Sequence, residues 1–438
     1  MTNCNLTPFS FSPLSGKKIE ASFSGGSITS NAGVLLLREI DRQLGLTRAL
    51  SKVISDPRDP NHIQHSTLSM LRQRIYSIAC GYEDLNDQDQ LRFDACFKTA
   101  VGKNHDLASR STLSRFENGS TRADCVAVSS MIVEQFIAQK KKAPKELVLD
   151  FDPTDDAIHG NQEGKHYHGY YEQYCFLPLY VFCEDQLLVS YLRPSDIDGA
   201  KHAWAILSLL VKRFRQAWPE VKITFRGDGG LCRDKMLNWC HKQGVDYVVG
   251  MAKNNRLMKA VQPDVQKAKA AYESKQTIQR RFVQFEYAAQ SWKAKRIMVA
   301  RIQVDEHGES VRFIATSIKG QAKTLYEKRY CARGHMENMI KQQKLDLFSD
   351  RTSCHGFLAN QMRVLLSGLA YVLLNALQRK TLTRSKRFRR AYVGTLRNAF
   401  LKVGAVIITN TRRVVLKLDS HYPHQDLFIK LTHKLTGT

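Results

Sequence analysis

The spacing of apolar residues in this chain changes near residue 145. Before that point, apolar positions recur at helical intervals, most clearly in residues 32–44 and 68–78. A Ser/Thr-rich stretch before residues 112–116 predicts a short helix there, and residues 125–139 predict a longer one. A basic run at 140–142 and Pro144 then mark a boundary. We therefore predict a mainly helical region over residues 1–145, after a polar, Gly/Ser-rich start.

Short apolar runs replace this spacing after residue 145. Strands are expected at 146–152, 176–183, 187–191, 221–225 and 247–250, with helices at 200–214 and 231–243. Three β-runs followed by β–α–β predict an α/β sheet with mixed strand directions. Residues 254–320 break this order with β-like runs at 281–287, 296–304 and 311–315. We interpret them as a β-rich insertion with one strand that returns to the sheet, and helices resume at about 326 and dominate to 378.

Composition points to a polyanionic partner. The 438 residues are 43% hydrophobic, enough for a substantial core, and the length suggests two or three domains. Lys and Arg number 66 against 41 Asp and Glu, a formal charge of +25, which favours nucleic acid as the partner. Residues 364–377 are too short for a membrane span, which needs roughly 20 apolar residues. The N-terminus lacks a signal-peptide pattern, so we expect a cytoplasmic protein with no membrane association.

The basic tail and the spacing of the cysteines further limit the classes of site that this protein can contain. From Arg379 onward the chain holds 14 Lys and Arg against two acids, most densely at 384–390. Arg387, Arg389 and Arg390 are therefore candidate phosphate contacts. The ten cysteines include no CxxC pair, which disfavours a zinc ribbon, and we expect reduced, mostly buried thiols.

Two acidic segments could carry chemistry at strand ends. Asp228 stands in a Gly-rich turn after the strand at 221–225, and ligands of open α/β sheets bind beyond the carboxyl ends of strands. The alternative is an Asp that only caps the next helix or forms an Asx turn. Asp150 and Asp152 project to the same face of their strand, and paired carboxylates favour either a divalent cation or exposure to solvent. Asp155 and Asp156 are interpreted as turn acids.

A third candidate is the helix that contains Tyr330, Arg333, Glu337 and Lys344. At helical spacing these four residues fall within roughly 60° of one another, beside an apolar stripe. The acid could bind a metal ion while the bases contact phosphate oxygens. The alternative is an amphipathic helix with an i,i+4 Arg–Glu pair on its surface.

These residues resemble a known family. The spacing Y-x2-R-x3-E-x6-K at residues 330–344 is similar to the signature of DDE transposases from bacterial insertion sequences, and Asp152-Pro-Thr154 and Arg226-Gly-Asp228 agree with it. Four further segments resemble the branch called transposase DDE domain group 1: ITSNAGVLLL at 28–37, STLSRFEN at 111–118, NQEGKHYHGY at 161–170 and RRAYVGTLRNAFLKVGA at 389–405.

The resemblance implies a domain plan. Residues 146–350 would form a ribonuclease-H-like catalytic domain with the β-rich insertion at about 254–320. Residues 1–145 would serve DNA binding and dimerisation, and residues 351–438 would form a basic helical region. The expected partners are the terminal inverted repeats and target DNA, bound by a homodimer.

The resemblance also implies a site and a reaction. Asp152, Asp228 and Glu337 would be the catalytic acids and would hold two Mg²⁺ ions, for which Mn²⁺ can substitute. Asp150 is the alternative first ligand. Tyr330, Arg333, Lys344 and Arg226 would contact DNA near the cut. The reaction would be cleavage at the element ends followed by strand transfer.

Three other functions compete with this one. A nuclease or resolvase of the same fold would cut without joining. A domesticated, inactive DNA-binding protein would lack one of the acids, and none is missing here. An RNA-binding protein would have aromatic-rich binding strands, whereas aromatic residues make up only 9% of this chain.

Overall fold

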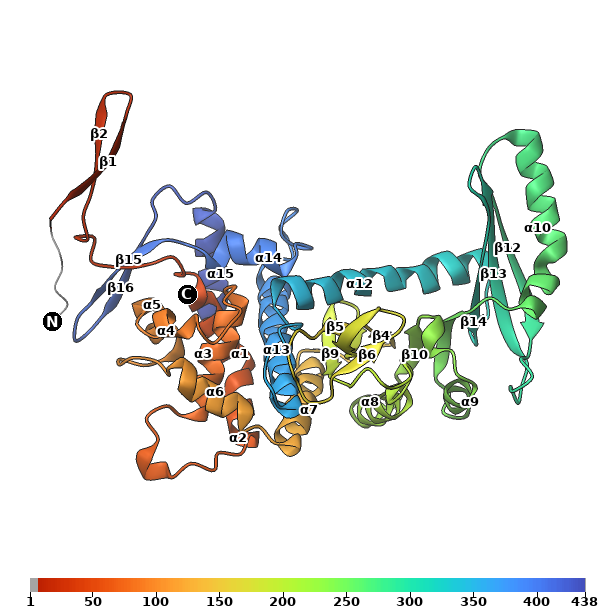
Figure 1. The fold of residues 1–438 in the computed structure, drawn as a ribbon, viewed down its shortest axis with the longest axis horizontal. Coiled ribbons are helices and arrows are strands. Elements are labelled where there is room, and N and C mark those ends of the chain that lie inside the picture. Colours follow the sequence, from red (N-terminus) through yellow and green to blue (C-terminus); the bar gives the residue numbers. More distant parts are fainter. Residues whose placement is uncertain (1–6, 438) are drawn as a thin grey trace. The chain divides into compact units, whose positions relative to one another are not determined.

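The computed structural model describes residues 7–437, which form two compact units (Figure 1). The first unit combines residues up to 128 with 346–348 and with the chain from 366 onward. The second unit contains residues 129–345 and 349–365. Helices α7 (Arg122–Ala138) and α13 (Phe357–Thr381) contribute residues to both units.

The first unit is mainly helical and includes the four helices predicted before residue 145. Besides α7 and α13, its helices and helical turns are α1 (Val34–Leu44), α2 (Leu46–Val53), η1 (Pro60–His62), α3 (Thr67–Ala79), α4 (Gln88–Leu91), α5 (Ala95–Val101), α6 (Arg110–Asn118), α14 (Val393–Leu396), η6 (Arg397–Leu401) and α15 (Gln425–Thr436). The expected helices at 32–44, 68–78, 112–116 and 125–139 correspond to α1, α3, α6 and α7.

The packing of α1 ties the two ends of the chain together in this unit. Its apolar stripe, with Val34, Leu37 and Ile40 fully buried, faces the core. Gly33 lies directly before the helix, and a Cβ there would come within 1.7 Å of the Phe400 carbonyl oxygen. Only glycine permits this approach.

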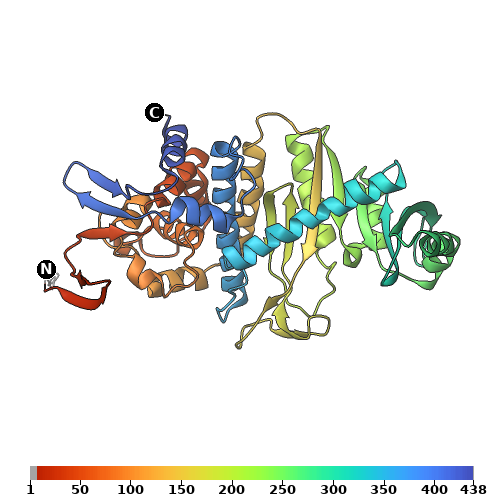
Figure 2. The same cartoon turned by 90° about the horizontal axis from the view of Figure 1, so that it is seen from above.

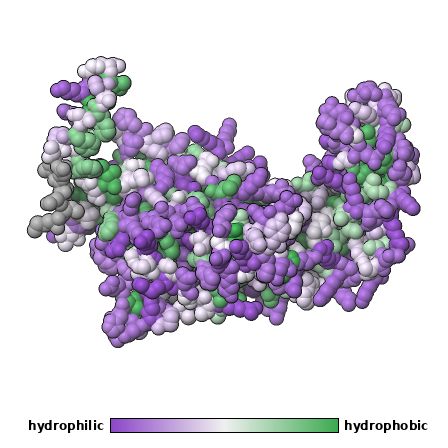
Figure 3. Space-filling model, in the orientation of Figure 1, coloured by the Kyte–Doolittle hydropathy of each residue, from purple (hydrophilic) through white to green (hydrophobic). Residues whose placement is uncertain are grey.

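Strands at both ends of the chain add to the mainly helical flanking regions that the sequence predicted. β1 (Phe9–Leu14) and β2 (Lys17–Ala21) form a hairpin, and β3 (Ser27–Thr29) pairs with β15 (Ala405–Thr409), which pairs with β16 (Val414–Leu418). Several apolar side chains of the hairpin are exposed, whereas hydrophilic residues dominate most of the face in Figure 3. Because β1 and β2 are exposed on both faces, a search for buried apolar runs does not find them.

The second unit is a mixed α/β structure built on one eight-stranded sheet. The strand order is β12-β13-β14-β11-β10-β4-β8-β9. β4, β10 and β11 run parallel to one another, and the remaining neighbours are antiparallel. The strands are β4 (Glu146–Pro153), β8 (Leu179–Cys183), β9 (Gln186–Tyr191), β10 (Lys222–Gly227), β11 (Asp246–Met251), β12 (Gln279–Tyr287), β13 (Arg296–Asp305) and β14 (Gly308–Thr316).

This sheet refines two of the predictions. The run at 176–183 is two strands, because Phe176 ends β7 (Gln173–Phe176), which belongs to a small sheet with β5 (Asp156–Ala157) and β6 (His166–His168). The insertion does not form a separate body, since β14 pairs with β11 and all three of its strands extend the main sheet.

Helices cover both faces of the sheet. α8 (Ala203–Ala217), α9 (Asp234–Lys242) and α10 (Asn255–Lys275) share one apolar core with it, and the helical turn η2 (Gly229–Leu231) follows β10. Helix α10 was not predicted from the sequence. On the other face, Leu325 and Tyr326 of a long helical segment pack on Val248, Val299 and Ile314. This segment runs from α11 (Ala322–Thr324) through η3 (Leu325–Tyr330), η4 (Cys331–Arg333) and α12 (Gly334–Lys341) to η5 (Gln342–Asp346), and crosses the sheet in Figure 2.

Within residues 7–437, one helix, α13, is long and apolar enough to cross a membrane by length and composition. However, 89% of its most apolar window is buried in the protein. It contains residues 364–377, which the sequence analysis interpreted as a buried helix.

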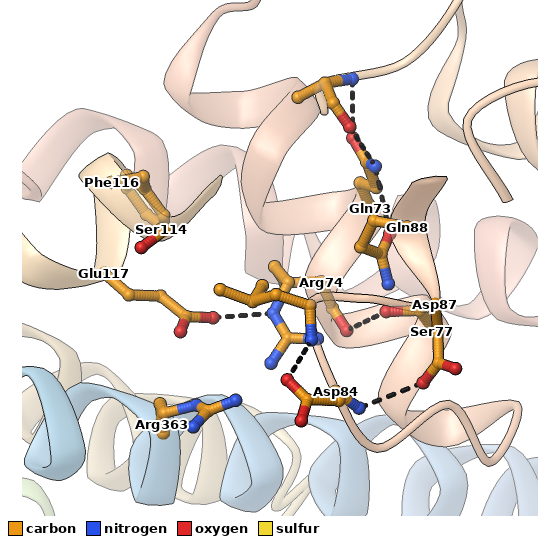
Figure 4. Close-up of polar contacts among 12 residues, drawn as sticks. Gln73, Arg74, Ser77, Asp84, Asp87, Gln88, Ser114, Phe116, Glu117 and Arg363 are labelled. Atoms are coloured by element: carbon orange, nitrogen blue, oxygen red, sulfur yellow. Dashed lines mark hydrogen bonds and ion pairs between the residues drawn. The ribbon is translucent and has the colours of Figure 1, made fainter. Parts of the chain in front are cut away.

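The first unit holds a buried ion pair that yields a stability prediction (Figure 4). Arg74 Nε donates to Glu117 Oε1 at 2.6 Å, and both side chains are almost completely buried. Arg74→Met should lower the free energy of unfolding by about 3–5 kcal/mol, because it removes one charge of a buried ion pair. Urea unfolding followed by circular dichroism measures the loss.

The double variant Arg74→Met/Glu117→Leu is the control. It should recover most of the lost stability, since both charges of the pair are then replaced by apolar side chains. Equal losses in the single and double variants would contradict this account.

Candidate active site

Two acids meet at the carboxyl ends of the central parallel strands. The register of β4 and β10 pairs Phe151 with Gly227, so the next residues, Asp152 and Asp228, stand side by side. Asp228 Oδ1 is buried and has no hydrogen-bond partner in the structure. The sequence pattern predicted Asp228 beyond the end of its strand, and the family resemblance grouped it with Asp152.

Arg333 connects the third acid to this edge. Its Nη2 donates to Asp152 Oδ1 at 2.8 Å, and its Nη1 donates to Glu337 Oε1 at 3.2 Å. The Arg333 side chain is 15% exposed, whereas that of Glu337 is 57% exposed. The helical segment therefore brings Glu337 toward Asp152 through one shared guanidinium group.

The environment of Asp152 opposes its ionisation. Burial above all, with a contribution from the negative charges of Asp228 and Glu337, raises the pKa of Asp152 to about 6, although Arg333 lowers it. A buried carboxylate beside two others gains from any added positive charge. The electrostatics of the site thus favour a cation.

Asp150 differs from Asp152 because it already has a cationic partner. Arg226, which lies opposite it on β10, binds both of its oxygens, with Nη2 at 2.6 Å from Oδ2. The same guanidinium donates through Nη1 to the Arg329 carbonyl oxygen at 2.6 Å. The sequence analysis named Arg226 as a DNA contact and did not foresee this pair, which depends on the register of two strands far apart in the sequence.

The helical segment is not one uniform α-helix, as the sequence analysis assumed. It has π-helical turns at 325–330 and 342–346 and a 3₁₀ turn at 331–333, irregularities that are frequent at functional sites. Tyr330 turns toward the sheet, where a Cβ on Gly250 would come within 2.8 Å of its hydroxyl oxygen. The glycine in β11 thus makes room for the phenol beside Asp228.

Lys344 lies at the turn that follows β4. Its Nζ donates to the Asp155 carbonyl oxygen and lies 3.8 Å from Asp156 Oδ1. Asp156 was interpreted as a turn acid, but it is completely buried in β5, and burial raises its pKa well above the ordinary value. Lys344 is the cation close to the buried Asp156 carboxyl group. This residue of the motif therefore also has a structural role.

The three tail arginines lie in the first unit, on a turn held by a buried ring. Arg387, Arg389 and Arg390 are exposed, whereas Phe388 is buried with its ring 4.8 Å from that of Phe400. The anchored phenylalanine keeps the three cations at the surface, as the sequence analysis expected for phosphate contacts.

The donor set at the strand ends suits a divalent cation, although the acids are not gathered around one point. Among the residues that the structure describes, no three His, Cys, Asp or Glu side chains lie close enough to hold a metal ion together. Hard cations such as Mg²⁺ prefer carboxylate oxygens, and Asp228 Oδ1 is a buried oxygen with no donor. Asp152, Asp228 and Glu337 therefore fit the ion chemically, with Arg333 between two of them.

Comparison with known proteins gave one family. The family model described as "Transposase DDE domain group 1" matches residues 11–438. No curated protein matches the chain. A solved structure of the piggyBac transposase synaptic complex with hairpin DNA is similar over 85% of this chain and 80% of that one, with 9% identity and a TM-score of 0.42.

The raised pKa of Asp152 makes stability depend on pH. In the metal-free protein, the wild type should lose stability as pH rises from about 4 through about 6, because the folded state resists ionisation of this carboxyl group. Asp152→Asn cannot ionise, so its melting temperature should rise relative to the wild type across this window. The difference should correspond to at most roughly 3 kcal/mol.

Differential scanning fluorimetry in EDTA at several pH values measures both proteins. If the melting temperatures of the two proteins differ by the same amount at every pH from 4 to 7, Asp152 ionises without a cost in stability.

Proposed function

The chain belongs to the family transposase DDE domain group 1, and from this premise we propose that it is a DNA transposase that cuts and joins phosphodiester bonds with Asp152, Asp228 and Glu337. The observation that carries the proposal is the position of these acids. Two stand side by side at the ends of β4 and β10, and the third reaches them through Arg333. The five strands β9-β8-β4-β10-β11 would be the ribonuclease-H-like core, an assignment supported by their order and directions.

In this proposal the acids hold Mg²⁺. When bound, divalent ions polarise the phosphate, activate the attacking oxygen and stabilise the leaving one. The chain's own residues supply the rest. Burial of Asp152 keeps water away, Asp228 offers an oxygen with no competing donor, and Arg333 offsets part of the negative charge. Cleavage and strand transfer would use this one site, because a DNA 3′-hydroxyl can take the place of water.

We assign Asp152, rather than Asp150, as the first metal ligand. Both oxygens of Asp150 accept from Arg226, so that carboxylate is already paired, whereas Asp152 shares its guanidinium with Glu337. Arg226 then positions the strands instead of contacting DNA, a revision of its expected role. Tyr330, which lies beside Asp228, remains a candidate DNA contact. Arg333 and Lys344 also remain candidate DNA contacts.

DNA is the proposed partner because of charge. The excess of +25 and the exposed arginines at 387, 389 and 390 suit a sequence-independent grip on phosphates. Two copies of the chain would hold two element ends together, one end for each.

The catalytic role is tested by conservative neutral variants. Glu337→Gln and Asp228→Asn should lower cleavage of a plasmid carrying the gene's native flanks by at least about a hundredfold, because each removes a carboxylate from the donor set. End binding should change by less than about threefold. Excision and joined products are measured in Mg²⁺, with EDTA as the metal-free reaction.

Glu273→Gln, the same change at an exposed position of α10, is the matched control and should cleave like the wild type. Full activity in Glu337→Gln would overturn the assignment. Cleavage without joined products would instead indicate a nuclease or resolvase, and binding without any cleavage would indicate a domesticated DNA-binding protein.

The DNA-binding role of the tail is tested by salt dependence. Replacing Arg387, Arg389 and Arg390 with Gln should make the plot of log affinity against log salt concentration less steep by about 1–3, since each lost phosphate contact removes about 0.9 from the slope. Fluorescence anisotropy between 50 and 200 mM salt measures the slope, and the melting temperature verifies folding. An unchanged slope would remove the tail from the DNA interface.

A further inference from the structure

A second polar feature adjoins the candidate active site on the side of the insertion. A pocket of about 230 Å³ opens where β11 and β14 meet the helical segment, and its lining includes Gly229, Gly250, Lys253, Arg312, Tyr326 and Tyr330. Gly229 directly follows Asp228, so the pocket begins beside that acid. The proposed cutting reaction does not use Lys253 or Arg312.

Two arginines face each other across neighbouring strands at this place. The register of β13 and β14 puts Arg301 directly opposite Arg312. Like charges at directly opposite positions destabilise a sheet. An anion bound between them would remove this cost, which makes the pair a candidate anion site.

The cations at this place are not compensated by the protein. Within residues 7–437, neither Arg301, Arg312 nor Lys253 forms an ion pair with an acid, and Arg301 Nε is buried without a hydrogen-bond partner. The remaining polar contact of Arg301 is a marginal one, from Nη2 to Ser310 Oγ at 3.5 Å. A buried guanidinium nitrogen without an acceptor is costly unless a ligand supplies one.

Aromatic rings form the side of the pocket that faces the helical segment. The guanidinium of Arg301 lies 5.9 Å from the ring centre of Tyr326, and the rings of Tyr326 and Tyr330 are 5.6 Å apart. The Tyr330 hydroxyl lies against Gly250, next to the backbone of Asp228. The same ring therefore borders both the pocket and the proposed catalytic acids.

We propose that this pocket binds a backbone phosphate of the DNA, a few nucleotides from the phosphodiester that is cut. Arg312 and Lys253, which line the pocket, hold the phosphate oxygens, and Arg301 adds its charge from its position opposite Arg312 and beside Tyr326. The tyrosine rings contact the adjoining sugar or base. Guanidinium groups suit this task because their planar forks match phosphate geometry. The assignment rests on the proposed function and gives the insertion strands a defined role in placing the DNA.

The test neutralises protein charges and DNA phosphates in combination. A duplex from the gene's flanking DNA is prepared with single methylphosphonates at successive positions near its end, and binding is measured in EDTA, where no cleavage is required. One substitution should weaken wild-type binding by about threefold to tenfold. Arg301→Gln/Arg312→Gln should bind unmodified DNA more weakly by a similar factor and be insensitive to that same methylphosphonate.

Lys212→Gln/Lys242→Gln is the control, because it removes two exposed charges from α8 and α9 on the other face of the sheet. It should keep the wild-type pattern. The arginine double variant should melt no lower than the wild type, since the like-charge repulsion is gone, whereas a purely structural role would lower its melting temperature.

Two results would overturn the proposal. In the first, no methylphosphonate in this region weakens binding by the wild type. In the second, the methylphosphonate that weakens wild-type binding weakens binding by the arginine double variant equally. If the pattern is found but the wild type cleaves no DNA in Mg²⁺, the phosphate site stands and the proposed function fails.

Discussion

The structure of the second unit depends on how negative charge is placed at the ends of two parallel strands. Asp150, Asp152 and Asp228 are brought to one edge by the pairing of β4 with β10, and mutual repulsion and desolvation both oppose that arrangement. Two arginines from different elements compensate. Arg226 pairs with Asp150 inside the sheet. Arg333 pairs with Asp152 from the helical segment that crosses the sheet. The position of that segment is thus coupled to the charge at the site.

Much of this unit could be predicted because its strands are buried on both faces and bounded by turns. The apolar runs of β4, β10 and β11 and the Gly-rich turn at Asp228 identified the central strands and their acidic ends. The grouping of Asp152 with Asp228 came from the family resemblance, because the sequence did not predict that β4 and β10 are parallel neighbours. Glu337 was found from its helical spacing with Tyr330, Arg333 and Lys344 and from the resemblance of that spacing to the family signature.

The rest depended on information that local patterns do not contain. Helix α10 has buried residues at helical spacing, Leu257, Val261, Val265 and Ala268, but Pro263 and many charged residues obscured the pattern. The pairing of Arg226 with Asp150, and of Arg301 with Arg312, depends on strand register. The π-helical turns that set the direction of Tyr330 leave no trace in composition. Tertiary packing decides each of these.

The close approach of Gly33 to Phe400 has a consequence for synthesis. The first unit joins residues before 128 to residues beyond 366, so its core lacks β15, β16 and η6 until the last part of the chain has been made. At about 5–20 residues per second, the ribosome takes tens of seconds to cover that interval. The largely continuous second unit can fold during this delay, whereas α1, which packs on α15 as well as on α2 and α5, must wait for the last helix of the chain. A chain cut short by premature termination would therefore carry the acids but never complete its first core.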